Sequence, residues 1–312
     1  MPLGPAVGLT LFAVWAVGQL ARDRTLATAW AFYLPSVVVL VALLLLAIIE
    51  VMRRRWRLAG LLLAVALFPA AGVLVVENRW LPRAVPVSPA GSETGRRADL
   101  RVIAWNAADF PRGVERAAAV LRPLDADLVL LSEAPGKPPR ELARQLAGDL
   151  RLTAVGSMAL FARGELSDLE WLAREGEVQA AFVRWAVDGR TLGVLAVNVI
   201  SSPRVPRDPL LQRIVAMIES HDPDLVLGDF NSPRRSRALA LLPAGFRHAY
   251  DASGTGWSST WPARLPLLAI DQTIVGPRLA VRGYRLQTTR ISDHRLQVTE
   301  LDFAVPPAGG SG

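Results

Sequence analysis

Residues 225–233 read Leu-Val-Leu-Gly-Asp-Phe-Asn-Ser-Pro. The apolar Leu-Val-Leu run is typical of a buried strand, and a Gly ends it. Asp229 and Asn231 follow, two residues apart, where the chain leaves the sheet. Strand ends are where α/β proteins usually place their chemistry, but Asp and Asn are also common in ordinary turns. The stretch therefore predicts either a functional strand end or a simple turn, and partners elsewhere in the chain must decide.

The composition excludes several kinds of site. The 312 residues contain no Cys, which rules out disulfides, thiol catalysis and Cys-based zinc or iron–sulfur sites. Ten Arg and four acidic residues fall within residues 1–98, so this segment carries nearly all of the net charge of +7. The rest of the chain is close to neutral, which argues against a general nucleic-acid-binding surface there.

Three uncharged apolar runs occupy residues 3–21, 26–49 and 58–76. Each is long enough to cross the hydrocarbon core of a bilayer, so we expect about three transmembrane helices in a membrane anchor at residues 1–80. Four Arg lie between the second and third runs, and the positive-inside rule places that loop in the cytoplasm. The chain after the third run is then expected to be extracytoplasmic.

Residues 99–303 are expected to form one α/β domain, because helices alternate with strands early and strands dominate late. The Pro- and Gly-containing segment 81–98 predicts a linker, and residues 304–312 predict a disordered tail. Three Arg at positions 234, 235 and 237 are predicted either to steer an anion or to lie on a solvated face. His221 and His248 are expected in solvated loops.

Polar side chains lie at the ends of four of the predicted strands of this domain. They are Asn106, Glu133, Asp229 with Asn231, and Asp293 with His294, and Asp271 inside an apolar strand is a fifth candidate. Hard oxygen ligands of this kind suit Mg²⁺ or Mn²⁺, which bind few carboxylates and keep waters for a phosphate substrate. A His beside a carboxylate suits acid–base work or the stabilisation of developing negative charge.

Five short motifs occur in a telling order: Trp-Asn-Ala at 105–107, Leu-Ser-Glu at 131–133, Gly-Asp-Phe-Asn at 228–231, Ile-Asp-Gln-Thr at 270–273 and Ser-Asp-His at 292–294. Together they resemble the endonuclease/exonuclease/phosphatase superfamily over about residues 99–303. Thr-Trp-Pro at 260–262 is similar to membrane-anchored bacterial members, which implies a multi-pass protein of a bacterial-type cell membrane. The resemblance implies a four-layer α/β sandwich with two mixed β-sheets, preceded here by the expected transmembrane helices.

The resemblance also implies a role for each candidate residue. A divalent metal, Mg²⁺ or Mn²⁺, is implied at Glu133, with Asn106 and Asp293 nearby. The implied catalytic set is Asp229 acting on the attacking water, Asn231 fixing Asp229 and the phosphate, His294 bonding the phosphoryl oxygen and Asp271 holding His294. The implied protein is a membrane-tethered phosphodiesterase, phosphatase or nuclease acting on a nucleic acid, a lipid head group or a small phosphate ester.

Two positions depart from the family pattern. Ala108 stands where members often have an acid, and Ile200 stands where a phosphate-gripping His is expected. Asn198 or Ser201 is predicted to supply a donor in its place, with Asn198 assigned to the catalytic set. The missing His leaves a second hypothesis, a catalytically weak or inactive binding domain on the same fold.

Overall fold

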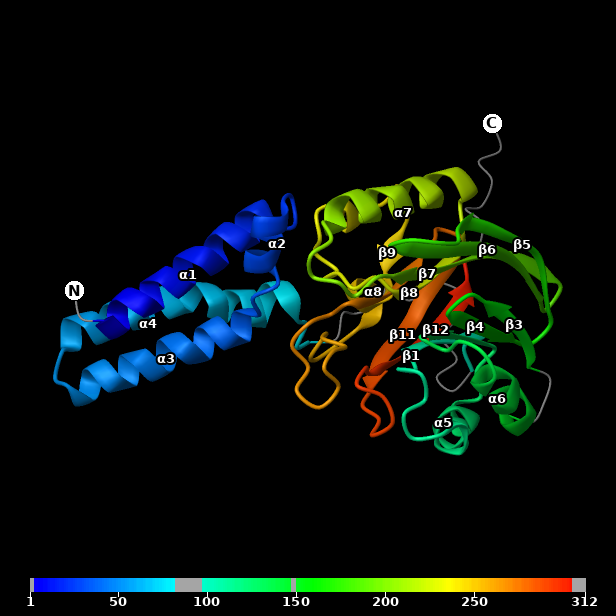
Figure 1. The fold of residues 1–312 in the computed structure, drawn as a ribbon, viewed down its shortest axis with the longest axis horizontal. Coiled ribbons are helices and arrows are strands. Elements are labelled where there is room, and N and C mark those ends of the chain that lie inside the picture. Colours follow the sequence, from blue (N-terminus) through cyan, green and yellow to red (C-terminus); the bar gives the residue numbers. More distant parts are fainter. Residues whose placement is uncertain (1–2, 82–96, 147–149, 305–312) are drawn as a thin grey trace.

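The computed structural model describes residues 3–81, 97–146 and 150–304. Most of the expected linker and of the expected tail therefore lies outside the described residues. Figure 1 shows a bundle of N-terminal helices that meets an α/β part built around two sheets.

Four helices and a short π-helical turn make up the bundle. They are α1 (Leu3–Ala21), α2 (Leu26–Phe32), α3 (Ser36–Met52), α4 (Trp56–Ala71) and η1 (Gly72–Glu77). Two segments, α1 and α4 continued by η1, are long and apolar enough to cross a membrane. The expected second run is bent by 64° between α2 and α3, so it makes a third span only if the bent pair counts as one. Pro35 explains the break, because a proline disfavours helical backbone at the preceding residue.

The two helices nearest the sheets pack closely within the bundle. A Cβ placed on Gly18 of α1 would lie 2.3 Å from the carbonyl carbon of Ala31 in α2. Only glycine permits this approach, so Gly18 fixes where α2 sits. Trp15 of α1 also donates its Nε1–H to Ser36 Oγ at 3.0 Å, which ties α1 to the start of α3.

The α/β part contains two six-stranded mixed sheets. Their strands are β1 (Leu100–Asn106), β2 (Leu128–Ser132), β3 (Arg151–Val155), β4 (Met158–Ala162), β5 (Glu165–Ala173), β6 (Val178–Val187), β7 (Arg190–Val199), β8 (Leu225–Asp229), β9 (Arg247–His248), β10 (Asp271–Val275), β11 (Leu279–Gln287) and β12 (Leu296–Phe303). The strand orders are β11-β12-β1-β2-β4-β3 and β5-β6-β7-β8-β10-β9. The strands that the sequence did not predict, β3, β5, β9 and β11, are the edges of these sheets, where partial exposure weakens the apolar pattern.

Alternating side chains along the strands build four layers. Val102 belongs to the core between the sheets, whereas Ile103 packs with the helices outside the first sheet. In the second sheet, Leu227 joins the same central core and Val226 packs with the helix on the other outer face. The outer helical elements are α5 (Val114–Leu121), η2 (Arg122–Leu124), α6 (Pro138–Leu146), α7 (Arg207–His221) and η3 (Ala238–Leu241). The short helix α8 (Ala249–Ser253) instead contributes Ala249 to the central core. The expected four-layer α/β sandwich is confirmed.

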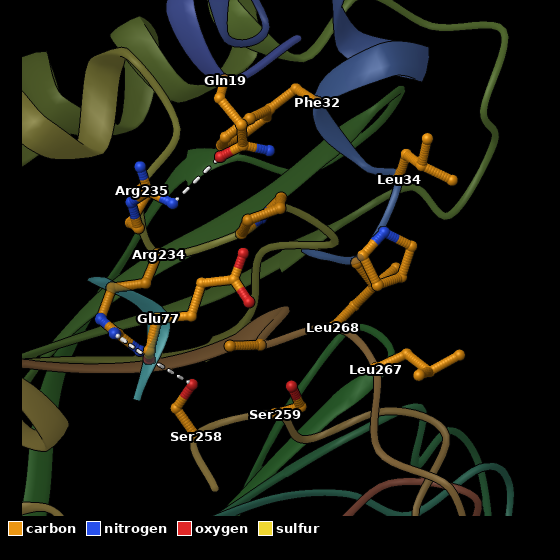
Figure 2. Close-up of a pocket in the computed structure, with 13 residues that line it drawn as sticks. Gln19, Phe32, Leu34, Glu77, Arg234, Arg235, Ser258, Ser259, Leu267 and Leu268 are labelled. Carbon is orange, nitrogen blue, oxygen red and sulfur yellow. Dashed lines mark hydrogen bonds between the residues drawn. The ribbon is translucent and has the colours of Figure 1, made fainter. Parts of the chain in front are cut away.

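The bundle is fastened to the sheets by the run of arginines that follows β8. Figure 2 shows Arg235 Nη1 donating to Gln19 Oε1 at 3.1 Å and Arg234 Nη2 donating to the backbone oxygen of Glu77 at 3.0 Å. The backbone N–H of Arg237 donates to Asp23 Oδ1, in the loop between α1 and α2, at 2.7 Å. These arginines therefore join the two parts of the molecule, which neither prediction for them anticipated.

Candidate active site

Strand register brings the predicted polar residues to one edge of the sandwich. Asn106 ends β1 and lies opposite Ser132 in the parallel β1–β2 ladder, one residue before Glu133. Asp229 ends β8 and lies opposite Asp271, the first residue of β10. Residues that are far apart in the chain thus meet because the strands that carry them end at the same edge.

Gly228 allows β8 to deliver Asp229 to this edge. Its φ is 145°, and a Cβ there would lie 1.8 Å from the backbone oxygen of Val197 in β7. Any other residue at this position would collide with the neighbouring strand. Beyond Asp229, Phe230 is fully buried in the core beneath α7, and Asn231 adopts a left-handed φ of 46°, which Asn tolerates better than most residues.

Asp229 is held by two hydrogen bonds and is almost completely buried, at 1% exposure. Its Oδ2 accepts from Asn106 Nδ2 at 2.9 Å, and its Oδ1 accepts from the backbone N–H of Asn231 at 2.8 Å. Burial, followed by the nearby charge of Asp271, raises the pKa of Asp229 to about 7. A carboxylate with a pKa near neutrality is suited to accept a proton from water.

His294 and Asp271 form a buried pair beside Asp229. His294 Nδ1 lies 2.8 Å from Asp271 Oδ2, and both side chains are less than a tenth exposed. Burial alone would lower the pKa of His294, but the charge and hydrogen bond of Asp271 outweigh it and raise that pKa to about 9. A protonated His294 bonded through Nδ1 still has its Nε2–H to offer to a phosphoryl oxygen.

Two sets of side chains have the chemistry of a divalent-cation site. Asp229, Asp271 and His294 offer ligand atoms within 4.8 Å of one another. However, His294 and Asp271 are already bonded to each other, so this set is better suited to acid–base work. Glu133 and Asp293 line a cavity beside it, and no hydrogen bond or ion pair between described residues engages the Glu133 carboxylate. An unengaged carboxylate with a second one nearby fits Mg²⁺ or Mn²⁺.

The cavity has a volume of about 620 Å³ and is lined by residues from both parts of the molecule. Its polar lining comes from Glu133, Ser201, Arg207, Asn231, Asp293 and His294. Its other walls come from Trp261, Leu268, Ile270 and the loop before α7, together with one side of α2. Asp229 and Asp271 are buried next to this lining, bonded to Asn231 and His294. Helix α2 of the bundle thus closes a cavity whose chemical groups come from the sheets.

A sequence model of the endonuclease/exonuclease/phosphatase family matches residues 103–294. This chain belongs to that family. Among curated proteins the sequence has no match.

Solved structures of the endonuclease/exonuclease/phosphatase family share the fold. Humanized D. rerio TDP2 with 14 mutations aligns with a TM-score of 0.56 and 16% identity, covering 65% of this chain and 98% of that one. A family protein from Bacteroides vulgatus aligns with a TM-score of 0.54 and 20% identity, covering 66% of this chain and 99% of that one. A family protein from Beutenbergia cavernae aligns with a TM-score of 0.55 and 19% identity, covering 68% of this chain and 74% of that one. At these identities the likeness shows the fold alone.

Arg207, which no family motif marks, also lines the cavity of this family member. It is the first residue of α7 and is 5% exposed. Its Nη2 donates to the backbone oxygen of Ser202 at 2.9 Å, while its Nη1 is buried without a hydrogen-bond partner among the described residues. Burial lowers the pKa of Arg207, yet a guanidinium stays charged at neutral pH. A buried cation with an unused N–H is well suited to a phosphate oxygen.

The structure separates the residues predicted to replace the missing family His. Ile200 is 40% exposed and Ser201 lines the cavity. Asn198 lies beside Asp229 in the β7–β8 ladder, but its Nδ2 donates to Ser157 Oγ at 2.8 Å. The structure therefore brings Ser201 to the cavity and directs the Asn198 amide elsewhere.

Asn106 is engaged at both ends of its side-chain amide. Its Nδ2 donates to Asp229, and its Oδ1 accepts from the backbone N–H of Ala108 at 2.8 Å. Ala108, where family members often carry an acid, thus contributes its backbone. These contacts position Asp229, and a further contact from Asn106 to a cation stays a prediction.

Proposed function

We propose that this family member is a membrane-tethered, Mg²⁺- or Mn²⁺-dependent phosphoesterase that hydrolyses a phosphate ester by attack of water. The observation that carries the proposal is geometric: the buried Asp229 carboxylate, held by Asn106 and Asn231, lies beside the His294–Asp271 pair at one end of a large cavity. One group accepts a proton and the other donates a hydrogen bond, which are the two tasks that phosphate hydrolysis sets.

The chain's own residues divide the work. Asp229 takes the proton of the attacking water, and Asn231 and Asn106 hold its two carboxylate oxygens in place. His294 donates to a phosphoryl oxygen, oriented by Asp271. Arg207, which lines the same cavity, supplies a positive charge for a second phosphoryl oxygen, and in this site it replaces the His that the family pattern expects near Ile200.

Glu133 and Asp293, with Asn106 nearby, are the residues that would hold the cation. A bound divalent cation supplies charge neutralisation of the phosphate and stabilises the negative charge that develops during hydrolysis. The unengaged carboxylate of Glu133 supports this assignment.

Membrane tethering and sidedness belong to the same proposal. We assign residues 1–80 to the anchor and residues 99–303 to an extracytoplasmic catalytic domain. Figure 1 supports this placement, since the α3–α4 turn lies at the end of the bundle away from the sheets. Arg53, Arg54 and Arg55 occupy that turn, and basic loops stay in the cytoplasm. A reporter active only after export, fused after Ala98, should therefore be active, and activity of a cytoplasm-only reporter would contradict the assignment.

A second candidate is a non-catalytic phosphate-binding domain, which the exposed Ile200 at the expected His position favours. Nucleic acid is a substrate class to include in the test, because one structural neighbour is D. rerio TDP2 complexed with a single strand DNA product. Lipid head groups and small esters complete the panel.

The test is hydrolysis of bis(4-nitrophenyl) phosphate and 4-nitrophenyl phosphate by the detergent-solubilised chain. We expect turnover with Mg²⁺ or Mn²⁺, loss with EDTA and recovery on adding metal back. Asp229→Asn and His294→Gln should each lose about 10²–10⁴-fold. His221→Gln, at the far end of α7, is the matched control and should keep the wild-type rate. Metal-independent turnover, or no turnover of any ester in the panel, would overturn the proposal.

A further inference from the structure

One side of α2 forms a wall of the active-site cavity. The residues that line it are Leu26, Ala29 and Trp30 of α2, together with Tyr33, which caps the C-terminal end of the helix. Their spacing of three, four and seven residues puts them on a single face of the helix. The helix has no charged residue, and Leu26 and Trp30 are 37% and 59% exposed. The cavity therefore has a charged end on the sheets and an apolar wall on the bundle.

The apolar wall lies within the bundle that contains the candidate membrane spans, and α2 forms part of one only together with α3. Helix α2 continues through a 64° bend into α3 and packs on the end of α1 at Gly18. Figure 1 shows α2 at the end of the bundle nearest the sheets, where spans of this length would leave the hydrocarbon core. An exposed Trp such as Trp30 is typical of that boundary.

We propose that the substrate is a membrane lipid that carries a phosphate ester. Its head group enters the charged end between His294 and Arg207, and its apolar part stays along the α2 face at the bilayer boundary. This inference rests on the proposed function and adds the substrate class. It follows from the cavity itself, because a soluble ester would leave the Leu26 and Trp30 face of α2 in contact with water.

The reaction needs no reactant beyond water. The water oxygen forms the new bond to phosphorus, and the bond from phosphorus to the departing alcohol breaks. One proton of the water passes to Asp229 and a proton is returned to the departing oxygen, so the products are a phosphate species and an alcohol. One of the products keeps the acyl or alkyl chains and remains in the bilayer.

Contacts between α2 and the turn after β8 also fix the apolar wall of the cavity relative to its charged end. Tyr33, at the end of α2, donates its hydroxyl to the backbone oxygen of Asn231 at 3.1 Å, and it lies 3.0 Å from Ser232 Oγ. Asn231 in turn holds the Asp229 carboxylate. The apolar wall and the proton acceptor are therefore linked through a single turn of backbone.

The test compares lipids with their chain-free head groups. The full chain is reconstituted into phosphatidylcholine vesicles containing either phosphatidic acid or phosphatidylglycerol. Separate samples receive glycerol 3-phosphate, glycerophosphoglycerol, a single-stranded oligonucleotide or bis(4-nitrophenyl) phosphate. We expect at least one lipid to be hydrolysed with a kcat/KM about tenfold or more above that of its chain-free counterpart, because the apolar wall binds the chains.

Variants of α2 test the lipid assignment through the ratio of kcat/KM for the lipid to kcat/KM for the aryl ester. Trp30→Ala and Leu26→Ala should lower the ratio of lipid to aryl-ester kcat/KM by about fivefold or more. Trp56→Ala, an equally exposed Trp beside the α3–α4 turn, should keep the wild-type ratio. An unchanged ratio in Trp30→Ala would overturn the lipid assignment, and so would hydrolysis of the oligonucleotide or the chain-free esters that is faster than hydrolysis of the lipids. In either case, continued turnover of the aryl ester would still support the proposed phosphoesterase activity. Failure of every ester, the aryl diester included, would overturn both.

Discussion

The cavity has two sides that were built by different means. On the sheet side, Asp229, Asp271 and His294 are buried and fixed by strand register and mutual hydrogen bonds. On the bundle side, α2 presents an uncharged, partly exposed face that is held by the close approach to Gly18 and by the Tyr33 hydroxyl. This difference shows that separate parts of the chain can determine the chemistry and the choice of substrate. Rigid strands position the reacting groups, whereas a helix from another part of the chain shapes the entrance to the cavity.

The largest effect is expected on the sheet side. Asp271→Asn keeps the shape of the side chain but removes the charge that orients and protonates His294. Hydrolysis of the aryl diester should fall about 10²–10⁴-fold with little change in the thermal midpoint. Asp168→Asn, on a side chain that is 71% exposed, is the control and should behave as wild type. A wild-type rate in Asp271→Asn would remove the His294–Asp271 pair from the mechanism.

Substitutions of Arg207 test a cavity residue that lies outside the family motifs. Arg207→Gln removes the buried cation and should slow hydrolysis about 10²-fold, the cost of one charge-stabilising donor. Arg207→Lys should recover part of the rate, because it restores the charge without the planar fork. Arg204→Gln, at an exposed position in the same loop, should leave the rate unchanged. An equal kcat/KM for wild type and Arg207→Gln would show that the guanidinium does not meet the phosphate.

Asn198, near the end of β7, can be compared with Ser201, which follows that strand. Asn198→Ala removes the hydrogen bond to Ser157 next to Asp229 and should slow hydrolysis about tenfold, the cost of one hydrogen bond near the site. Ser201→Ala, which changes a side chain that lines the cavity, is the parallel variant. If only Ser201→Ala slows the reaction, the predicted catalytic role of Asn198 is wrong and Ser201 is the donor near Ile200.

The smallest effect is expected from the bundle. Gly18→Ala must push α2 away from α1, so kcat/KM for a vesicle lipid should fall a few-fold while the aryl ester changes less. Gly60→Ala in α4, where a Cβ meets nothing within 4 Å, is the matched control. Identical lipid kinetics for the two glycine variants would mean that the position of α2 does not matter to the substrate.

Sequence patterns predicted the sheet side because each polar residue lies beside a short apolar strand. The motifs at Asn106, Glu133, Asp229, Asp271 and His294 are local, and strand register with the His294–Asp271 hydrogen bond then assembles them. The edge strands were missed because their residues are partly exposed. His248 was expected in solvent, yet it is 7% exposed, and burial lowers its pKa to about 4. His248 is the last residue of the short edge strand β9, which the sequence did not predict, so nothing local indicated the packing around it.

The bundle side could not be predicted in the same way. Residues 26–49 are uniformly apolar, so they indicated one straight span, and only Pro35 marked the break that creates α2. The spacing of Leu26, Ala29, Trp30 and Tyr33 defines a helix face, but nothing local shows that this face meets the sheets. The contacts of α2 with Asn231 and of Arg235 with Gln19 depend on tertiary packing between distant segments.

The central claim is that the strand ends and α2 together enclose the working active site. The chain has no Cys, so a Trp30→Cys variant can be labelled at one position with a bulky maleimide. The labelled protein should lose most of its hydrolysis of both lipid and aryl ester, whereas a labelled Trp56→Cys variant should keep it. Undiminished hydrolysis after complete labelling at position 30 would contradict the claim, because a bulky group on the α2 face would then leave the active site open.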